Sequence, residues 1–115
     1  MAHIRRLSAS EQHRFKKWLQ DLDITLNDRT RRDVYCNVPP VARIFKRSHK
    51  RVDLNCYPTV SSVALRLKNW RVFNFRVLRK LGLCRAPWEL QNLAAGKEGA
   101  VDCLLYELME RVSRV

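Results

Sequence analysis

One nineteen-residue segment, Leu65–Leu83, restricts the fold more than any other part of the chain: LRLKNWRVFNFRVLRKLGL. Its apolar residues recur at i, i+3, i+7, i+8 and i+11, which places them on one face of an α-helix: Trp70, Phe73, Val77, Leu78 and Leu81. Six Lys or Arg and no acidic residue occupy the segment: Arg66, Lys68, Arg71, Arg76, Arg79 and Lys80. The pattern predicts a helix that buries one face and presents cations to an anionic partner. A solvated amphipathic helix without a partner gives the same pattern.

The N-terminal part of the chain predicts a second helix. Ser8-Ala9-Ser10-Glu11 has the spacing of a capping box, in which the Ser8 hydroxyl accepts from the Glu11 amide and the Glu11 carboxylate reaches back. An apolar stripe follows at helical spacing: Phe15, Trp18, Leu19 and Leu22. We expect residues 1–7 to be flexible and residues 25–32 to form a polar loop.

The middle of the chain contains Pro39-Pro40, which fit only the first turn of a helix. We therefore predict a helix from Pro39 or Pro40 to Arg47 or Ser48, entered by an irregular or short helical segment over residues 33–38. Residues 52–59 are expected to be extended or looped.

The remaining helices are marked by their ends. Ser61-Ser62 are suited to cap the long helix and Gly82 to end it, and Pro87 opens a short helix that runs toward Gly96. A last helix begins near Gly99 with the stripe Val101, Leu104, Leu105, Leu108, Met109 and Val112.

No segment alternates with period 2, so the sequence predicts an all-α fold with four main helices and one or two short ones. Residues 1–115 are expected to form one domain. We expect the core to be organised by side chains of the long helix against those of the first and last helices: Trp70, Phe73 and Leu81 against Trp18, Leu22, Leu104 and Leu108.

The cysteines are far apart in the sequence, at positions 36, 56, 84 and 103, without the close ligand pairs of a zinc site. Because the N-terminus lacks the apolar core of a secretory signal, we expect reduced, structural thiols and no metal or other cofactor. No trustworthy nucleophile–base set or phosphate loop occurs, so we expect no enzymatic activity. No apolar run approaches the ~20 residues of a membrane span.

Charge is the strongest indication of a partner. The chain has 23 Lys and Arg against 11 Asp and Glu, a formal net charge of +12. Residues 1–85 hold 20 of the basic and 6 of the acidic residues, so the excess lies outside the last 30 residues. Nucleic acid, an anionic membrane surface and acidic protein tails are the partners that such a charge favours.

Three segments, in order along nearly the whole chain, resemble the calponin-homology-like domain of the sperm-flagellar (CLAMP) family and its spermatogenesis-associated relatives. The segment 67–81 resembles L-x-N-W-x-x-L-N-x-x-V-L-x-K-L, with Phe73 at the second family Leu. The segment 98–108 is similar to P-G-V-V-E-x-x-L. Trp18-Leu19, Arg32-Asp33 and Val41–Ile44 resemble W-[LV]…R-D-F-S-D-G-x-x-[VI]-A-E-[VI], although residues 33–37 lack the family Gly and Arg43 replaces its Glu.

The resemblance implies a calponin-homology fold of four principal helices and cytoskeletal work in cilia and flagella. We therefore expect a microtubule-binding module in the cytoplasm, on the axonemal cytoskeleton, that docks on acidic tubulin. Other axonemal proteins are further candidate partners, and actin is not expected to be one. The alternative is a nucleic-acid-binding helical domain that uses the same basic surface. The candidate binding residues are Arg31, Arg32, Lys46, Arg47, Lys50, Arg51, Arg66, Lys68 and Arg71.

Overall fold

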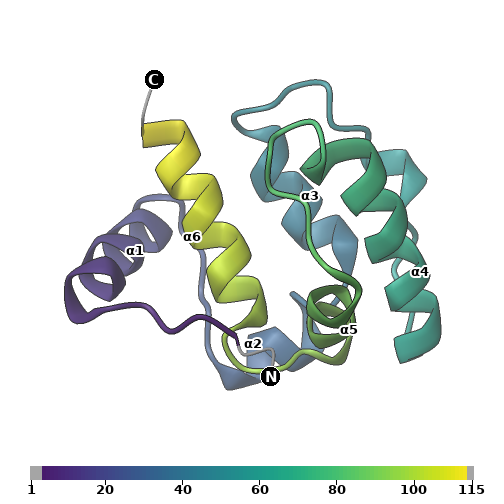
Figure 1. The fold of residues 1–115 in the computed structure, drawn as a ribbon, viewed down its shortest axis with the longest axis horizontal. Helices are drawn as coiled ribbons and strands as arrows, with labels where there is room; N and C mark the ends of the chain where they lie inside the picture. The colour runs from purple at the N-terminus through teal and green to yellow at the C-terminus, as the bar shows by residue number, and fades with distance from the viewer. Residues whose placement is uncertain (1–3, 114–115) are drawn as a thin grey trace.

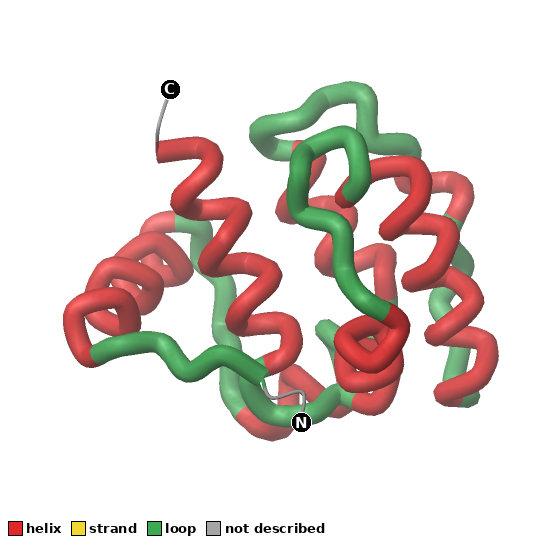
Figure 2. Tube along the Cα trace, in the orientation of Figure 1, coloured by secondary structure: helices red, strands yellow, loops and turns green. Residues whose placement is uncertain are grey.

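The computed structural model describes residues 4–113 of the chain. Residues 1–3, part of the N-terminus expected to be flexible, and residues 114–115 lie outside the described part. Residues 4–113 form helices and no strand (Figures 1 and 2). The elements are α1 (Ala9–Asp21), α2 (Asp28–Asp33), α3 (Val38–Lys46), the 3₁₀-helix η1 (Leu54–Cys56), α4 (Val63–Phe73), the π-helix η2 (Asn74–Leu78), α5 (Pro87–Ala95) and α6 (Ala100–Ser113). The predicted all-α class is confirmed.

Helix ends follow the local sequence signals. The Ser8 hydroxyl accepts from the Glu11 amide and the Glu11 carboxylate accepts from the Ser8 amide, so the predicted capping box is confirmed. Ser62 caps α4 by accepting from the Leu65 amide at 3.1 Å. Gly96 ends α5 with φ = 69°, a left-handed conformation that glycine adopts without steric cost.

The expected polar loop over residues 25–32 is wrong in its second half, because α2 begins at Asp28. The Asn27 side chain accepts from the Thr30 amide at 2.9 Å. In return, the Asn27 amide donates to the Thr30 hydroxyl at 2.9 Å. This reciprocal cap nucleates a six-residue helix with no buried residue. A helix of that kind has no apolar stripe for periodicity to detect.

The long helix predicted from Leu65–Leu83 is present as α4 followed directly by η2. In η2 the backbone widens, and the Arg79 amide donates to the carbonyl of Asn74 at 2.9 Å. The wider turn delays the rotation of the residues that follow. Trp70, Phe73 and Leu78 are fully buried, whereas Leu81, which follows the wider turn, is only partly buried.

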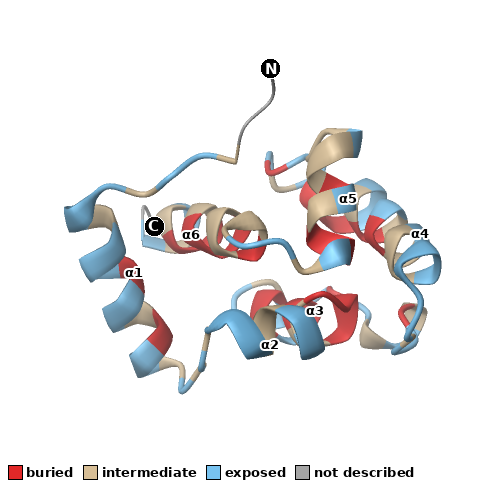
Figure 3. Cartoon of the chain, turned by 90° about the horizontal axis from the view of Figure 1, so that it is seen from below, coloured by how far each residue is buried: buried red, intermediate tan, exposed pale blue. Residues whose placement is uncertain are grey.

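Helix α6 lies between α1 on one side and α3, α4 and α5 on the other (Figure 1), and its inner face is buried (Figure 3). The long helix packs mainly against α5 and α3, while α1 packs against α6. The main partners of the long helix are therefore α5 and α3, and not α1 and α6 as expected. Trp18 stacks on Phe15 of its own helix and remains partly exposed. The buried apolar residues nevertheless form one cluster that both helices join.

Phe73 is the centre of the aromatic core. Its ring contacts three others edge-on, at centroid distances of 5.3 Å to Phe45, 5.5 Å to Tyr57 and 5.8 Å to Trp70. The Trp70 indole donates to the Cys36 carbonyl at 2.8 Å, which satisfies its buried N–H group. These contacts fix the long helix against α3 and determine where its outer, basic side faces.

Candidate binding surface

Four predicted binding residues lie at the C-terminal end of α3 and in the loop that follows. The Lys46 ammonium donates to the carbonyls of Lys50, at 3.2 Å, and Val52, at 2.7 Å, and so closes this loop. The Arg47 guanidinium donates to the Leu22 carbonyl at 3.2 Å. Lys50 and Arg51 are exposed, with no ion-pair partner among the described residues. Of the four, only Lys50 and Arg51 have side chains that make no hydrogen bond or ion pair within residues 4–113.

Arg76 of the long helix lies at this same end of the molecule. Its guanidinium donates to the Cys56 thiol sulfur at 3.4 Å, beside η1. The Asn55 amide and the Cys56 thiol lower the pKa of Asp53, and the charges of Lys46 and Arg76 lower it further. Lys46 and Arg76 therefore approach one carboxylate from two segments that are thirty residues apart in the sequence.

The outer side of η2 carries an exposed aromatic ring. Phe75 is 61% exposed, and the Arg79 guanidinium carbon lies 4.2 Å from the centroid of its ring. Lys80 follows, exposed and with no ion-pair partner among the described residues. An exposed aromatic ring stacked by Arg is a common anchor in protein interfaces. None of Phe75, Arg76, Arg79 and Lys80 was among the predicted binding residues, although Phe75 lies off the apolar stripe of its helix.

Three predicted residues belong to the first half of the long helix and lie elsewhere. Arg66 donates to the Val60 carbonyl at 3.2 Å, and the Val60 amide donates to Asn37, the N-cap of α3. A helix of nine residues is about 13 Å long, so Arg66 and Lys46 lie near opposite ends of α3. Lys68 and Arg71 are exposed on α4. The structure therefore places Arg66 away from the cations at the end of α3.

Arg31 and Arg32 lie on α2 and differ from one another. The Arg31 guanidinium binds both carboxylate oxygens of Asp102, at 2.8 and 2.7 Å, and also contacts Asp28 at 3.0 Å. Only 16% of its side chain is exposed, and the Asp102 carboxylate raises its pKa. Arg31 therefore ties α2 to α6 and has no free donor face, whereas Arg32 is exposed.

The cysteine thiols are free, and Cys36 is buried at the start of α3, where desolvation raises its pKa. Within residues 4–113, no group of three or more His, Cys, Asp or Glu side chains could hold a metal ion. No helix in that range is long and apolar enough to cross a membrane. The geometry offers exposed cations at the end of α3 and on the long helix, where Arg79 stacks on the exposed ring of Phe75.

Comparison with known families gives one match over most of the chain. A family model described as "CH-like domain in sperm protein" matches residues 15–110. The match includes every helix from α2 to α5 and most of α1 and α6. A search of curated proteins gives no significant match.

Proposed function

Since the chain belongs to the family of CH-like domains in sperm proteins, we propose that it is a microtubule-binding module of the axoneme in cilia or flagella. CH-like domains are generally non-catalytic binding modules, and family membership indicates a module associated with the cytoskeleton. The finer proposal places the protein in the cytoplasm, on axonemal microtubules and their associated proteins. It rests on the charge of the chain and on where its cations lie.

The observation that carries the proposal is that Arg76, next to the exposed ring of Phe75, brings the cations of the long helix toward those at the end of α3. We define the proposed basic patch as the cations at the end of α3 and of the long helix, together with this ring: Lys46, Arg47, Lys50, Arg51, Phe75, Arg76, Arg79 and Lys80. Asp53 is the acidic residue next to it, and the patch outnumbers it seven charges to one. Such an excess supports attraction to a strongly acidic protein surface.

Tubulin offers an acidic outer surface and acidic C-terminal tails. A domain with a net charge of +12 is drawn toward them over a distance of about 8 Å at physiological salt. Close contact then adds charge-assisted hydrogen bonds between guanidinium and carboxylate groups. Phe75 supplies the apolar area that steers the contact toward one orientation.

Arg66, Lys68 and Arg71 remain a second candidate group on the same helix. Arg32 contributes to the overall charge, and Arg31 is left out of the proposed surface because Asp102 occupies its guanidinium. The alternative function, nucleic-acid binding, would use the same cations. Most aromatic rings are buried in the core, where they cannot stack on bases, and this favours the protein partner.

Co-sedimentation tests the proposal. The purified domain is mixed in parallel with microtubules, with microtubules whose acidic tails have been removed by limited proteolysis, with actin filaments and with duplex DNA. We expect binding to intact microtubules that falls steeply between about 50 and 200 mM salt, weaker binding without the tails, and none to actin. Salt-sensitive binding to DNA with no binding to microtubules would replace the proposal with the alternative.

A further inference from the structure

The segment that leads into α1 combines three features that the proposed function does not use. Residues 5–8 read Arg-Arg-Leu-Ser, and residues 4–8 have no helical structure. Arg5, Arg6 and Ser8 are exposed. Serine kinases with acidic substrate clefts select serines by arginines two and three positions before them, and they bind this stretch in an extended form. Ser8 has Arg at both positions, and no other Ser or Thr of the chain does.

The surroundings of Ser8 leave it accessible. Its hydroxyl accepts from the Glu11 amide at 3.2 Å and lies 3.3 Å from the Ser10 hydroxyl. Arg6 has no ion-pair partner among the described residues, so a kinase cleft can engage it without breaking a contact. Ala9 and Ser10, which follow, are exposed as well. The first turn of α1 has to open and Arg5 has to leave Glu11 and Cys103, and helix ends open at low cost.

We propose that Ser8 is a phosphorylation site for an arginine-directed serine kinase. In the transfer, the Ser8 oxygen forms a bond to the γ-phosphorus of Mg-ATP, and the bond from that phosphorus to the β–γ bridging oxygen breaks. ADP leaves with the bond's electron pair, and the hydroxyl proton passes to the catalytic carboxylate of the kinase. The inference does not depend on tubulin binding.

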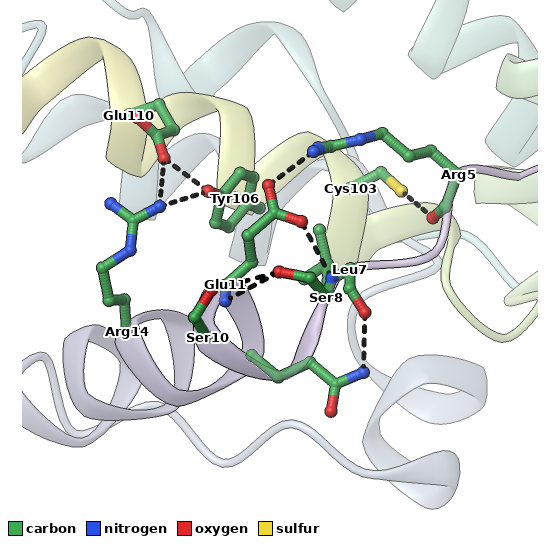
Figure 4. A network of polar contacts seen from close by, with 10 residues as sticks. Arg5, Leu7, Ser8, Ser10, Glu11, Arg14, Cys103, Tyr106 and Glu110 are labelled. Atoms are coloured by element: carbon green, nitrogen blue, oxygen red, sulfur yellow. Dashed lines mark hydrogen bonds and ion pairs between the residues drawn. The ribbon is translucent and has the colours of Figure 1, made fainter.

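The contacts around Ser8 define what the phosphate would change. Arg5 pairs with the Glu11 carboxylate, and the Arg5 carbonyl accepts from the Cys103 thiol at 2.9 Å, which holds the segment against α6 (Figure 4). The Glu11 carboxylate also accepts from the Ser8 amide at 2.8 Å. A phosphate of about −2 charge on Ser8 would therefore lie beside Glu11 and repel it.

Arg5 is the group that can resolve this repulsion, because its guanidinium already reaches the residue next to the phosphate. The phosphate also gains from the positive end of the α1 dipole, where a second anion is favourable. On phosphorylation, the Arg5 guanidinium thus exchanges its ion-pair partner, from the Glu11 carboxylate to the phosphate. Arg5 and Leu7 also line a groove of about 1280 Å³ with Phe15 and Trp88, so the exchange alters one wall of that groove.

The test uses the folded 115-residue chain, Mg-ATP and the catalytic subunit of cAMP-dependent protein kinase, with phosphopeptide mapping by mass spectrometry. We expect one phosphate, on Ser8. Arg6→Ala should slow its incorporation at least tenfold without changing the fold, because Arg6 makes no ion pair within residues 4–113. The control Ser10→Ala should leave the rate within about twofold. Phosphate on another residue, or incorporation only into the urea-unfolded chain, would overturn the site.

Phosphorus NMR tests the exchange of Arg5. A phosphoserine has its second pKa near 6, and pairing with Arg5 should hold it lower. Arg5→Ala should then raise that pKa in the phosphorylated protein, while Arg6→Ala, phosphorylated to completion over a longer time, should not. Equal values in the phosphorylated wild type and Arg5→Ala would show that Arg5 does not move to the phosphate.

Discussion

Two adjacent arginines show how far neighbouring residues of one type can differ in role. Arg31 forms a bidentate ion pair with Asp102, and both side chains are more than four-fifths buried. Arg32, the next residue, is exposed. In the sequence both are members of one basic run. Nothing near them distinguishes Arg31, because its partner Asp102 lies 71 positions away. Only the packing of α2 on α6 separates them.

Arg31→Ala should therefore destabilise the fold, since it leaves the Asp102 carboxylate largely buried without its cation. We expect the free energy of unfolding to fall by about 2–4 kcal/mol. Arg32→Ala is the matched control and should change it by less than about 0.5 kcal/mol. Urea denaturation followed by circular dichroism measures both, and similar losses in the two variants would contradict the assignment of Arg31 to the fold.

Glu11 is the residue whose titration should be visible in acid. Hydrogen bonding from the Ser8 amide, and then from the Arg5 guanidinium, lowers its pKa from 4.5 to about 2. The folded state therefore favours the carboxylate, and the stability that Glu11 contributes is present above pH 4.5 and is lost as the pH falls toward 2.

Glu11→Gln removes this titration. The variant should be less stable than the wild type at pH 7, and the difference should shrink between about pH 4.5 and 2, as seen in thermal melts across that range. A difference that stays constant down to pH 2 would show that Glu11 is not held in its charged form by the fold.

At the scale of the helices, the long helix offers a second matched pair. Phe73 is fully buried among three aromatic rings, whereas Phe75, two residues later, is 61% exposed. Phe73→Ala should lower the free energy of unfolding by about 3–5 kcal/mol, and Phe75→Ala should change it by less than about 0.5 kcal/mol. Urea denaturation distinguishes the two variants. Equal losses in the free energy of unfolding would mean that the buried and exposed faces of the long helix are wrongly assigned.

Periodicity and capping signals were sufficient to predict most elements. The capped starts of α1 and α4, the proline start of α5 and the stripe of α6 were all read from residues within a few positions of one another. The two elements that were missed could not be found from an apolar stripe, although α2 has a local cap in Asn27 and Thr30. Helix α2 has no apolar face, and the π-helix η2 depends on tertiary contacts such as the pair of hydrogen bonds between the Asn74 side chain and the Arg85 backbone.

At the scale of the whole molecule, the sequence predicted the sign of the surface better than its layout. The charge of +12 is a property of composition and needs no structure. Which cations lie together depends on how α3 and the long helix pack, and the density of Lys and Arg along the sequence cannot reveal this packing. That density selected Lys46–Arg51 and the first half of the long helix, whereas the structure brings Arg76, in the second half, to the end of α3.

The central claim is that the proposed basic patch, and not net charge alone, binds tubulin. The patch variant reverses four of its cations whose side chains make no hydrogen bond to the part of the fold that the structure describes: Lys50→Glu, Arg51→Glu, Arg79→Glu and Lys80→Glu. Lys46 and Arg47 are kept because they donate to backbone carbonyls. The control variant reverses four exposed cations outside the patch: Arg6→Glu, Lys16→Glu, Lys17→Glu and Lys97→Glu. Each variant lowers the net charge from +12 to about +4.

Microtubule co-sedimentation of these two variants, with equal melting temperatures as the check on folding, is the most direct measurement. Exposed charges contribute about 0.2–1 kcal/mol each, so the patch variant should bind roughly 10- to 100-fold more weakly than the wild type. The control should lose no more than about threefold. Equal weakening of the two variants, or unchanged affinity in the patch variant, would contradict the account.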